Sequence, residues 1–129
     1  MSPASGAPSG HVIVCGLGRV GYRLAMMLLR LGERVVVINE TARADWLRAV
    51  TDAGAEVISG DARSAATLAA AGLPTAKAII AATNHDVVNI ETALDARQER
   101  PDLPIVVRLF DRDLADMLED RLGVRRALG

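Results

Sequence analysis

Three glycines with the spacing Gly16-x-Gly18-x-x-Gly21 are the residues of this chain best suited to a chemical task. They follow an apolar run, Val12–Cys15, and precede a helical apolar pattern, so they predict a turn between a buried strand and a helix. In such a turn the first glycine permits the tight bend, the second lets the backbone approach a phosphate, and the third lets helix and strand pack closely. The N–H groups at the start of the helix then favour an anion. The motif therefore predicts a binding site for the pyrophosphate of a dinucleotide.

Polar side chains also follow the other predicted strands. They are Asn39 and Glu40 after the second strand, Asp61 after the third, Thr83 and Asn84 after the fourth, and Arg108 at the end of the fifth. In an open parallel sheet, ligands bind outside the carboxyl ends of the strands, where the strand order reverses. These side chains therefore predict the walls of a nucleotide cleft.

Strand-like and helix-like segments alternate along the chain. Strands are predicted at 12–15, 35–38, 56–58, 78–82, 105–109 and 124–128, and helices at 20–31, 42–52, 64–71, after Thr83 or Asn84, and at 114–122. Strands that start about every 20–27 residues with a helix between them are typical of βαβ units, whose crossovers are right-handed. We therefore expect an α/β fold, a Rossmann-like doubly wound parallel sheet of about six strands with helices on both faces. It would occupy residues 11–129, behind a disordered leader at 1–10.

Helical periodicity predicts which side chains face the sheet. The expected inward residues are Val20, Leu24, Met27, Leu28 and Leu31 in the first helix, Trp46, Leu47 and Val50 in the second, and Val87, Ile90 and Leu94 in the fourth. Thr41 is expected to cap the second helix, and Thr83 or Asn84 the fourth. Thr83 with Asp86 fits a capping box, which favours a structural role for Asp86.

Composition disfavours several classes of protein. The net charge is −1, and 15 basic residues are interleaved with 16 acidic ones, so we expect no nucleic-acid partner. No apolar run approaches the roughly 18 residues that span a bilayer, so we expect no direct membrane insertion. Cys15 is the only cysteine, which excludes an intramolecular disulfide and a cysteine zinc site. Neither His11 nor His85 has a second metal ligand beside it, and both are expected at exposed ends of elements.

Five segments together resemble the RCK/KTN (TrkA-N) family, the cytoplasmic regulators of potassium channels and transporters. They are Gly-Leu-Gly-Arg-Val-Gly (16–21), Val-Val-Ile-Asn-Glu (36–40), Gly-Asp-Ala (60–62), Ala-Thr-Asn-His-Asp-Val-Val-Asn (82–89) and Val-Arg-Leu-Phe-Asp (107–111). Their order and spacing are similar to those of the family's N-terminal nucleotide-binding lobe. The resemblance implies a regulatory role without enzymatic activity.

The same resemblance implies roles for individual residues. The glycine turn, Gly16, Leu17, Gly18, Arg19, Val20 and Gly21, would bind phosphates, with Arg19 reaching a terminal phosphate or the pyrophosphate. Asn39 and Glu40 would face the adenosine ribose, and Asp61 and Ala62 would face the adenine. An acidic residue can accept a hydrogen bond from the exocyclic amine of that base. The far half of the cleft would be lined by Ala82, Thr83, Asn84, Asn89 and Arg108.

The implied ligand is NAD(H), with ATP, ADP, AMP or NADP(H) as alternatives. The family commonly has Asp where this chain has Asn39, and a neutral Asn lacks the repulsion that rejects a 2′-phosphate. Arg43 lies nearby in sequence, whereas Glu40 could restore a preference for NAD(H).

The implied partners are a second copy of the lobe, in a dimer or larger ring, and a membrane potassium channel or transporter subunit. The domain would then lie in the cytoplasm, attached to the inner face of the membrane through that subunit. Two other functions stay open: the cofactor-binding domain of a small NAD(P)-dependent oxidoreductase, and a structural assembly lobe with an empty cleft. Against the first, Tyr22 and Lys77 are the only residues of their types and form no Tyr-x-x-x-Lys pair.

Overall fold

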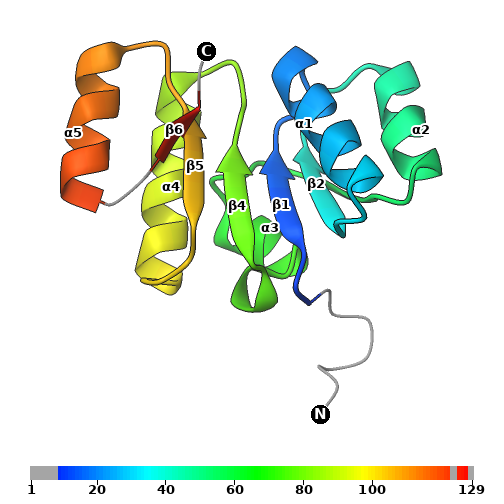
Figure 1. The fold of residues 1–129 in the computed structure, drawn as a ribbon, viewed down its shortest axis with the longest axis horizontal. Coiled ribbons are helices and arrows are strands. Elements are labelled where there is room, and N and C mark those ends of the chain that lie inside the picture. The colour runs from blue at the N-terminus through cyan, green and yellow to red at the C-terminus, as the bar shows by residue number, and fades with distance from the viewer. Residues whose placement is uncertain (1–8, 123–124, 128–129) are drawn as a thin grey trace.

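A single parallel sheet organises the computed structural model, which describes residues 9–122 and 125–127 (Figure 1). Its six strands run in the order β3-β2-β1-β4-β5-β6, which confirms the predicted doubly wound topology. The elements are β1 (Val12–Cys15), α1 (Arg19–Arg30), β2 (Val35–Asn39), α2 (Ala44–Asp52), β3 (Glu56–Ser59), α3 (Ala65–Ala70), a 3₁₀ turn η1 (Leu73–Thr75), β4 (Ala78–Ala81), α4 (Asp86–Glu99), β5 (Ile105–Arg108), α5 (Arg112–Leu122) and β6 (Arg125–Ala127). The strand order reverses between β1 and β4, so the predicted cleft lies above that boundary.

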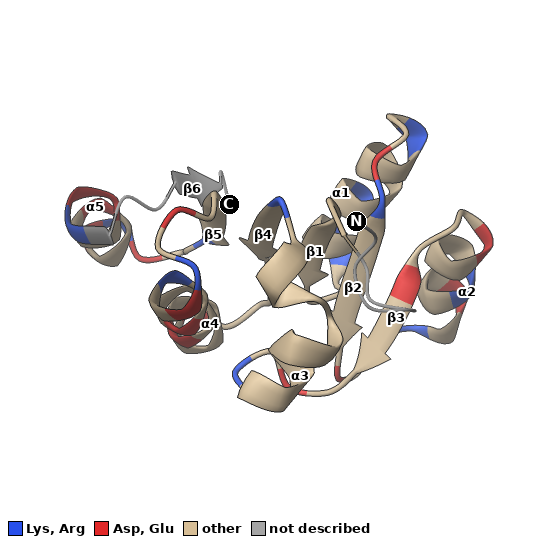
Figure 2. Ribbon diagram, turned by 90° about the horizontal axis from the view of Figure 1, so that it is seen from below, with Lys and Arg blue, Asp and Glu red and all other residues tan. Residues whose placement is uncertain are grey.

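The two faces of the sheet are covered by different helices. Helices α1 and α2 pack on one face over β1 to β3, and α3, α4 and α5 pack on the other (Figures 1 and 2). Within the described residues no helix covers β4 and β5 on the α1 face, where Ile80 and Val106 are only half-buried. On the opposite face Ile79 and Val107 are fully buried. The sheet is therefore covered on both faces in one half and on one face in the other.

Helix α1 meets the sheet through small residues. Gly21 and Ala25 are its buried positions, and Leu28 packs beside them. The prediction that Met27 and Leu31 face inward is wrong, because these side chains are 56% and 74% exposed. Periodicity identified the apolar positions, but the helix lies too close to β1 for large side chains at the point of contact.

Helix α4 shows the same effect. Val87 and Leu94 were expected to face inward, and both are exposed. The buried face carries Asn89, Ala93 and Ala96 instead, so small and polar residues make the contact. Large apolar side chains on the outer faces of α1 and α4 therefore did not indicate the core side.

Helix α2 follows its prediction more closely. Val50 is buried, and Trp46 and Leu47 pack against the sheet beside it. The ring of Trp46 stacks on Tyr22 of α1, with the two ring centroids 5.1 Å apart. The guanidinium of Arg43 covers Trp46, with its Cζ 4.6 Å from the ring centroid.

The helix starts differ from those expected. Arg43, not Thr41, occupies the N-cap position of α2, and no side chain caps it. His85, rather than Thr83 or Asn84, occupies the N-cap position of α4. In both cases the observed N-cap lies one or two residues beyond the predicted one. In the loop before α4, Thr83 and Asn84 instead make hydrogen bonds to Asn89 and Arg108.

Charged residues of both signs share the helices. Figure 2 shows acidic and basic residues side by side on α2, α4 and α5. In the part of the chain that the structure describes, no helix is both long enough and apolar enough to cross a membrane.

His11 is fully buried at the start of β1, so the prediction of an exposed position is wrong. Its Nε2 donates a hydrogen bond to the carbonyl oxygen of Ala71, 2.8 Å away, and its buried Nδ1 has no hydrogen-bond partner among the described residues. Burial lowers the pKa of His11, with a further lowering by the charge of Arg34. The folded chain therefore keeps this imidazole neutral.

We expect the free energy of unfolding to fall as the pH drops from 7 to 5. In the unfolded chain the pKa of His11 is near 6.5, and burial lowers it in the folded chain, so the unfolded chain takes up more protons at this group as the pH falls through that value. Thermal unfolding at a series of pH values measures this slope. His11→Gln should flatten it. The contribution of the Asp61 carboxyl, whose pKa is lowered to about 2, is lost only below about pH 4.

Candidate functional site

The glycine turn joins β1 to α1 with no room for side chains at two of its glycines. A Cβ on Gly21 would lie 1.8 Å from the carbonyl oxygen of Gly16, and a Cβ on Gly16 would lie 2.9 Å from Cα of Thr83. Gly16 also has a φ of +96°, a conformation that L side chains rarely adopt. The fold itself therefore requires glycine at these two positions.

Gly18 is different, because the protein around it would accept a side chain. A Cβ there would meet only the side-chain amide of Asn84, with Nδ2 at 3.6 Å and Oδ1 at 3.8 Å, and the backbone of Gly18 is extended with a negative φ. Gly18 is the N-cap of α1, and it offers no side chain to the first helical N–H groups. The first turn also contains no acidic residue. No capping side chain therefore satisfies these N–H groups, an arrangement that favours an anion at a helix start.

The other members of the turn frame this helix start. Leu17 is buried and anchors the turn in the apolar layer under α1. Val20 is half-buried, and Arg19 is exposed. Arg19 therefore stands exposed at the first position of the helix.

Backbone hydrogen bonds bring the strand-end loops to one edge. The N–H of Gly16 donates to the carbonyl of Ile38 at 2.8 Å, and the N–H of Gly60 donates to that of Asn39 at 3.0 Å. The N–H of Ala82 donates to the carbonyl of Cys15 at 2.9 Å. The loops after β1, β2, β3 and β4 thus start side by side, as predicted for the cleft.

Asn39 ends β2 with an unused acceptor. The residue is only 6% exposed, and its Oδ1 is buried without a hydrogen-bond partner among the described residues. Glu40, the next residue, is exposed. A buried amide oxygen without a donor costs free energy, so this atom fits a ligand that supplies a hydroxyl.

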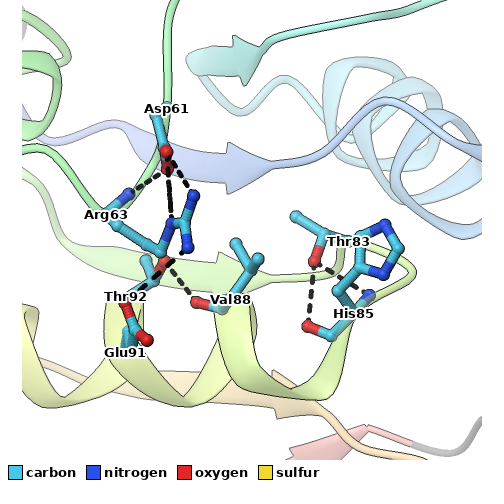
Figure 3. A network of polar contacts seen from close by, with 7 residues as sticks. All are labelled: Asp61, Arg63, Thr83, His85, Val88, Glu91 and Thr92. Carbon is cyan, nitrogen blue, oxygen red and sulfur yellow. Dashed lines mark hydrogen bonds and ion pairs between the residues drawn. The ribbon is translucent and has the colours of Figure 1, made fainter.

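Asp61 is hydrogen-bonded to Arg63, a residue that the sequence did not indicate as part of the site. Arg63 donates to its carboxylate from the backbone N at 2.9 Å, from Nε at 3.0 Å and from Nη2 at 2.7 Å (Figure 3). These hydrogen bonds lower the pKa of Asp61 to about 2. Ala62 between them is buried. The Asp-x-Arg spacing is the only sequence signal for this pair.

Asn89 links the ends of two strands from inside the protein. It is fully buried, its Oδ1 accepts from the N and Oγ1 of Thr83 at 3.0 and 2.6 Å, and its Nδ2 donates to the carbonyls of Thr83 and Arg108 at 3.0 and 2.8 Å. The amide therefore positions the ends of β4 and β5. Any effect of Asn89 on a ligand would pass through Thr83, since its own polar atoms are occupied.

Arg108 lies at the end of β5 beside the loop after β4. Its Nη1 donates to Oδ1 of Asn84 at 3.0 Å, and its Cζ lies 4.6 Å from the ring centroid of Phe110. Its buried Nε has no partner among the described residues. Asn84 therefore lies between the arginine and the glycine turn, since a Cβ added at Gly18 would be 3.6 Å from its Nδ2.

Asp86 has the structural role expected of it, in another form. As the first residue of α4, it accepts hydrogen bonds from the backbone N–H groups of Phe110 at 2.9 Å and Asp111 at 3.1 Å. It therefore fixes the loop after β5 instead of completing a capping box with Thr83. No group of three or more His, Cys, Asp and Glu side chains suited to a metal ion occurs in the ranges that the structure describes.

Two alanine substitutions in the turn should separate the needs of the fold from those of a ligand. Gly21→Ala should lower the free energy of unfolding by at least about 2 kcal/mol, because the new methyl group meets backbone. Gly18→Ala should cost no more than about 1 kcal/mol, since its Cβ makes an ordinary contact. Denaturant unfolding of both variants measures this difference. Equal losses would contradict the assignment of separate roles.

Loss of the Asn89 amide should destabilise the protein strongly. Asn89→Ala leaves the N–H of Thr83 and the carbonyl of Arg108 without their buried partner, at a cost of about 2–4 kcal/mol. Asn84→Ala, which removes an exposed amide from the same edge, should cost less than about 1 kcal/mol. Thermal unfolding of the two variants tests this order.

Comparison with known proteins agrees with this geometry. The family model of the TrkA-N domain matches residues 12–128. The potassium uptake protein TrkA of Streptomyces coelicolor is 31% identical over 114 residues, which are 88% of this chain and 50% of that protein. The chain spans half or less of the length of the curated relatives that it matches.

Two solved structures share the fold and about a quarter of the sequence. The TrkA-N domain of the inner membrane protein ybaL from Escherichia coli superposes with a TM-score of 0.81 at 26% identity, over 94% of this chain and 87% of that one. The Kef CTD of Shewanella denitrificans in its AMP-bound form gives 0.79 at 26% identity, over 93% and 71%. The predicted resemblance is confirmed, and the chain belongs to the TrkA-N domain family.

Proposed function

We propose that this chain is a regulatory nucleotide-binding domain that controls a membrane potassium channel or transporter from the cytoplasm. The relatives support this role, because one is named as a potassium uptake protein and another was solved with AMP bound. The ligand would be NAD(H) or an adenine nucleotide. A second copy of the domain and the membrane subunit are the proposed partners.

The start of α1 is the observation that carries the proposal. Gly18 leaves the first helical N–H groups uncapped, and the protein around it does not require glycine. Arg19 stands exposed next to it. A helix N-terminus with a neighbouring guanidinium fits a phosphate or pyrophosphate. Gly16, Leu17, Val20 and Gly21 would shape this phosphate site.

The loop after β2 fits the ribose of an adenosine. The buried Oδ1 of Asn39 lacks a donor, and a ribose hydroxyl would supply one. Arg43, the arginine that could attract a 2′-phosphate, makes a bidentate pair with Asp45 at 3.1 and 2.8 Å and stacks on Trp46. Because Asp45 compensates the charge of that guanidinium and the exposed Glu40 adds a negative charge to the same loop, we infer that NAD(H), AMP, ADP or ATP is preferred over NADP(H).

The contacts between loops suggest how a bound nucleotide could act at a distance. Asn84 lies beside the glycine turn and accepts a hydrogen bond from Arg108, and Asn89 holds the ends of β4 and β5 together. A ligand that binds one arrangement of these loops more tightly shifts the population toward it, by no more than its difference in affinity. We infer that this change in population reaches the partner subunit. The far side of the ligand would be lined by Ala82, Thr83, Asn84 and Arg108.

A thermal-shift panel with AMP, ADP, ATP, NADH and NADPH tests this function. A ligand at about a hundred times its Kd should stabilise the domain by about 2.7 kcal/mol, or several degrees in Tm. The Gly18→Ala variant should remain folded but show no increase in Tm with these nucleotides. If no nucleotide changes Tm, the chain is a structural assembly lobe. A larger increase in Tm with NADPH than with NADH would contradict the preference against NADP(H) inferred from Asn39 and Arg43. Turnover of a nicotinamide cofactor would indicate an oxidoreductase instead.

A further inference from the structure

The pair formed by Asp61 and Arg63 changes what the adenine end of the proposed site offers to a base. This inference rests on the proposed nucleotide-binding function. An isolated carboxylate at position 61 would accept from the exocyclic amine of adenine and repel the carbonyl oxygen of a 6-oxopurine. Here three N–H donors of Arg63 already contact that carboxylate. The guanidinium of Arg63 therefore compensates the negative charge of the Asp61 carboxylate at the point where that carboxylate would contact the base.

Arg63 lies among three segments that border this end of the cleft. Asp61 belongs to the loop after β3, Glu91 belongs to α4, and the charge of Glu40 from the loop after β2 also acts on the guanidinium. In Figure 3 the side chain of Arg63 spans from the loop to the helix. The guanidinium is thus positioned where a base between these segments would meet it.

The guanidinium keeps donors for a ligand. Its Nη1 lies 4.0 Å from Oε2 of Glu91, which is an ion-pair distance and too long for a hydrogen bond. The Arg63 side chain is 42% exposed. The two bonds to Asp61, from Nε and Nη2, hold the guanidinium plane in one orientation. A planar donor fork of this kind can bind N7 of any purine and O6 of a 6-oxopurine, and its face can stack on the ring.

We propose that Arg63 is the base-contacting residue of this site, that Asp61 positions it, and that the site accepts 6-oxopurine as well as 6-aminopurine nucleotides. Arg63 is then the residue that determines base selectivity. Removing it would return Asp61 to its role as an amine acceptor, so the variant should become selective for adenine.

Calorimetric titration with AMP and IMP tests the proposal. The Kd values for the unaltered protein should agree within about threefold, since both bases meet the same guanidinium. Arg63→Ala should weaken IMP binding by about tenfold or more relative to AMP, because the freed Asp61 carboxylate faces O6. Arg30→Ala, at the far end of α1 from the glycine turn, is the matched control and should change neither Kd. If NADH is the tighter ligand, NADH and its hypoxanthine analogue replace AMP and IMP.

Two results would overturn the proposal while leaving the nucleotide-binding function intact. One is a preference of the unaltered protein for AMP over IMP of more than about tenfold, which would mean that an acceptor reads the amine. The other is an Arg63→Ala variant with an unchanged AMP-to-IMP ratio, which would make the pair a surface contact only. Arg63→Gln, which keeps a neutral donor, provides a second variant for the same ratio. Failure of every nucleotide to bind would instead reject the proposed function and this inference together.

Discussion

The close approach of α1 to β1 is the constraint on which the rest of this structure depends. The carbonyl of Gly16 occupies the space where a side chain at position 21 would begin, only 1.8 Å from an added Cβ. That contact sets the direction in which α1 leaves the sheet. It also decides which side of the helix is buried, so that Gly21 and Ala25 face inward while Met27 and Leu31 face outward. The uncapped helix start is then placed above the boundary between β1 and β4.

The polar groups at the strand ends divide into those that the protein already satisfies and those that it leaves open. Both polar atoms of the Asn89 amide are hydrogen-bonded, to Thr83 and Arg108, and the Asp61 carboxylate is hydrogen-bonded to Arg63. Asn39 keeps a buried oxygen without a donor. In a low-dielectric setting a satisfied network is rigid and an unsatisfied group favours a partner. The edge therefore combines a fixed frame with a small number of open positions.

Much of this fold could be predicted from sequence, because its signals are local. The glycine spacing and the alternation of short apolar strands with helices identify the topology, and most predicted strand limits agree within one residue. Apolar periodicity predicts the inward positions of Leu28 in α1 and Ile90 in α4. It fails for Met27, Leu31, Val87 and Leu94, since small residues make the closest helix–sheet contacts. The burial of His11 depends on a carbonyl 60 residues away. For the pairing of Arg63 with Asp61, sequence offers a spacing but not the orientation of the side chains.

The uneven cover of the sheet has a consequence for a molecule bound at the glycine turn. Strands β1 to β3 are layered between helices on both sides, whereas β4 and β5 are backed on one side only within the described residues. Among the described residues, the strands of the first half therefore pack against helices on both faces, whereas Ile80 and Val106 of the second half stay half-buried on one face. The glycine turn lies at the boundary between these two halves, where the strand order reverses between β1 and β4. A molecule bound at this boundary would contact loops from both halves of the sheet at once, one half packed on both faces and the other packed on one face among the described residues.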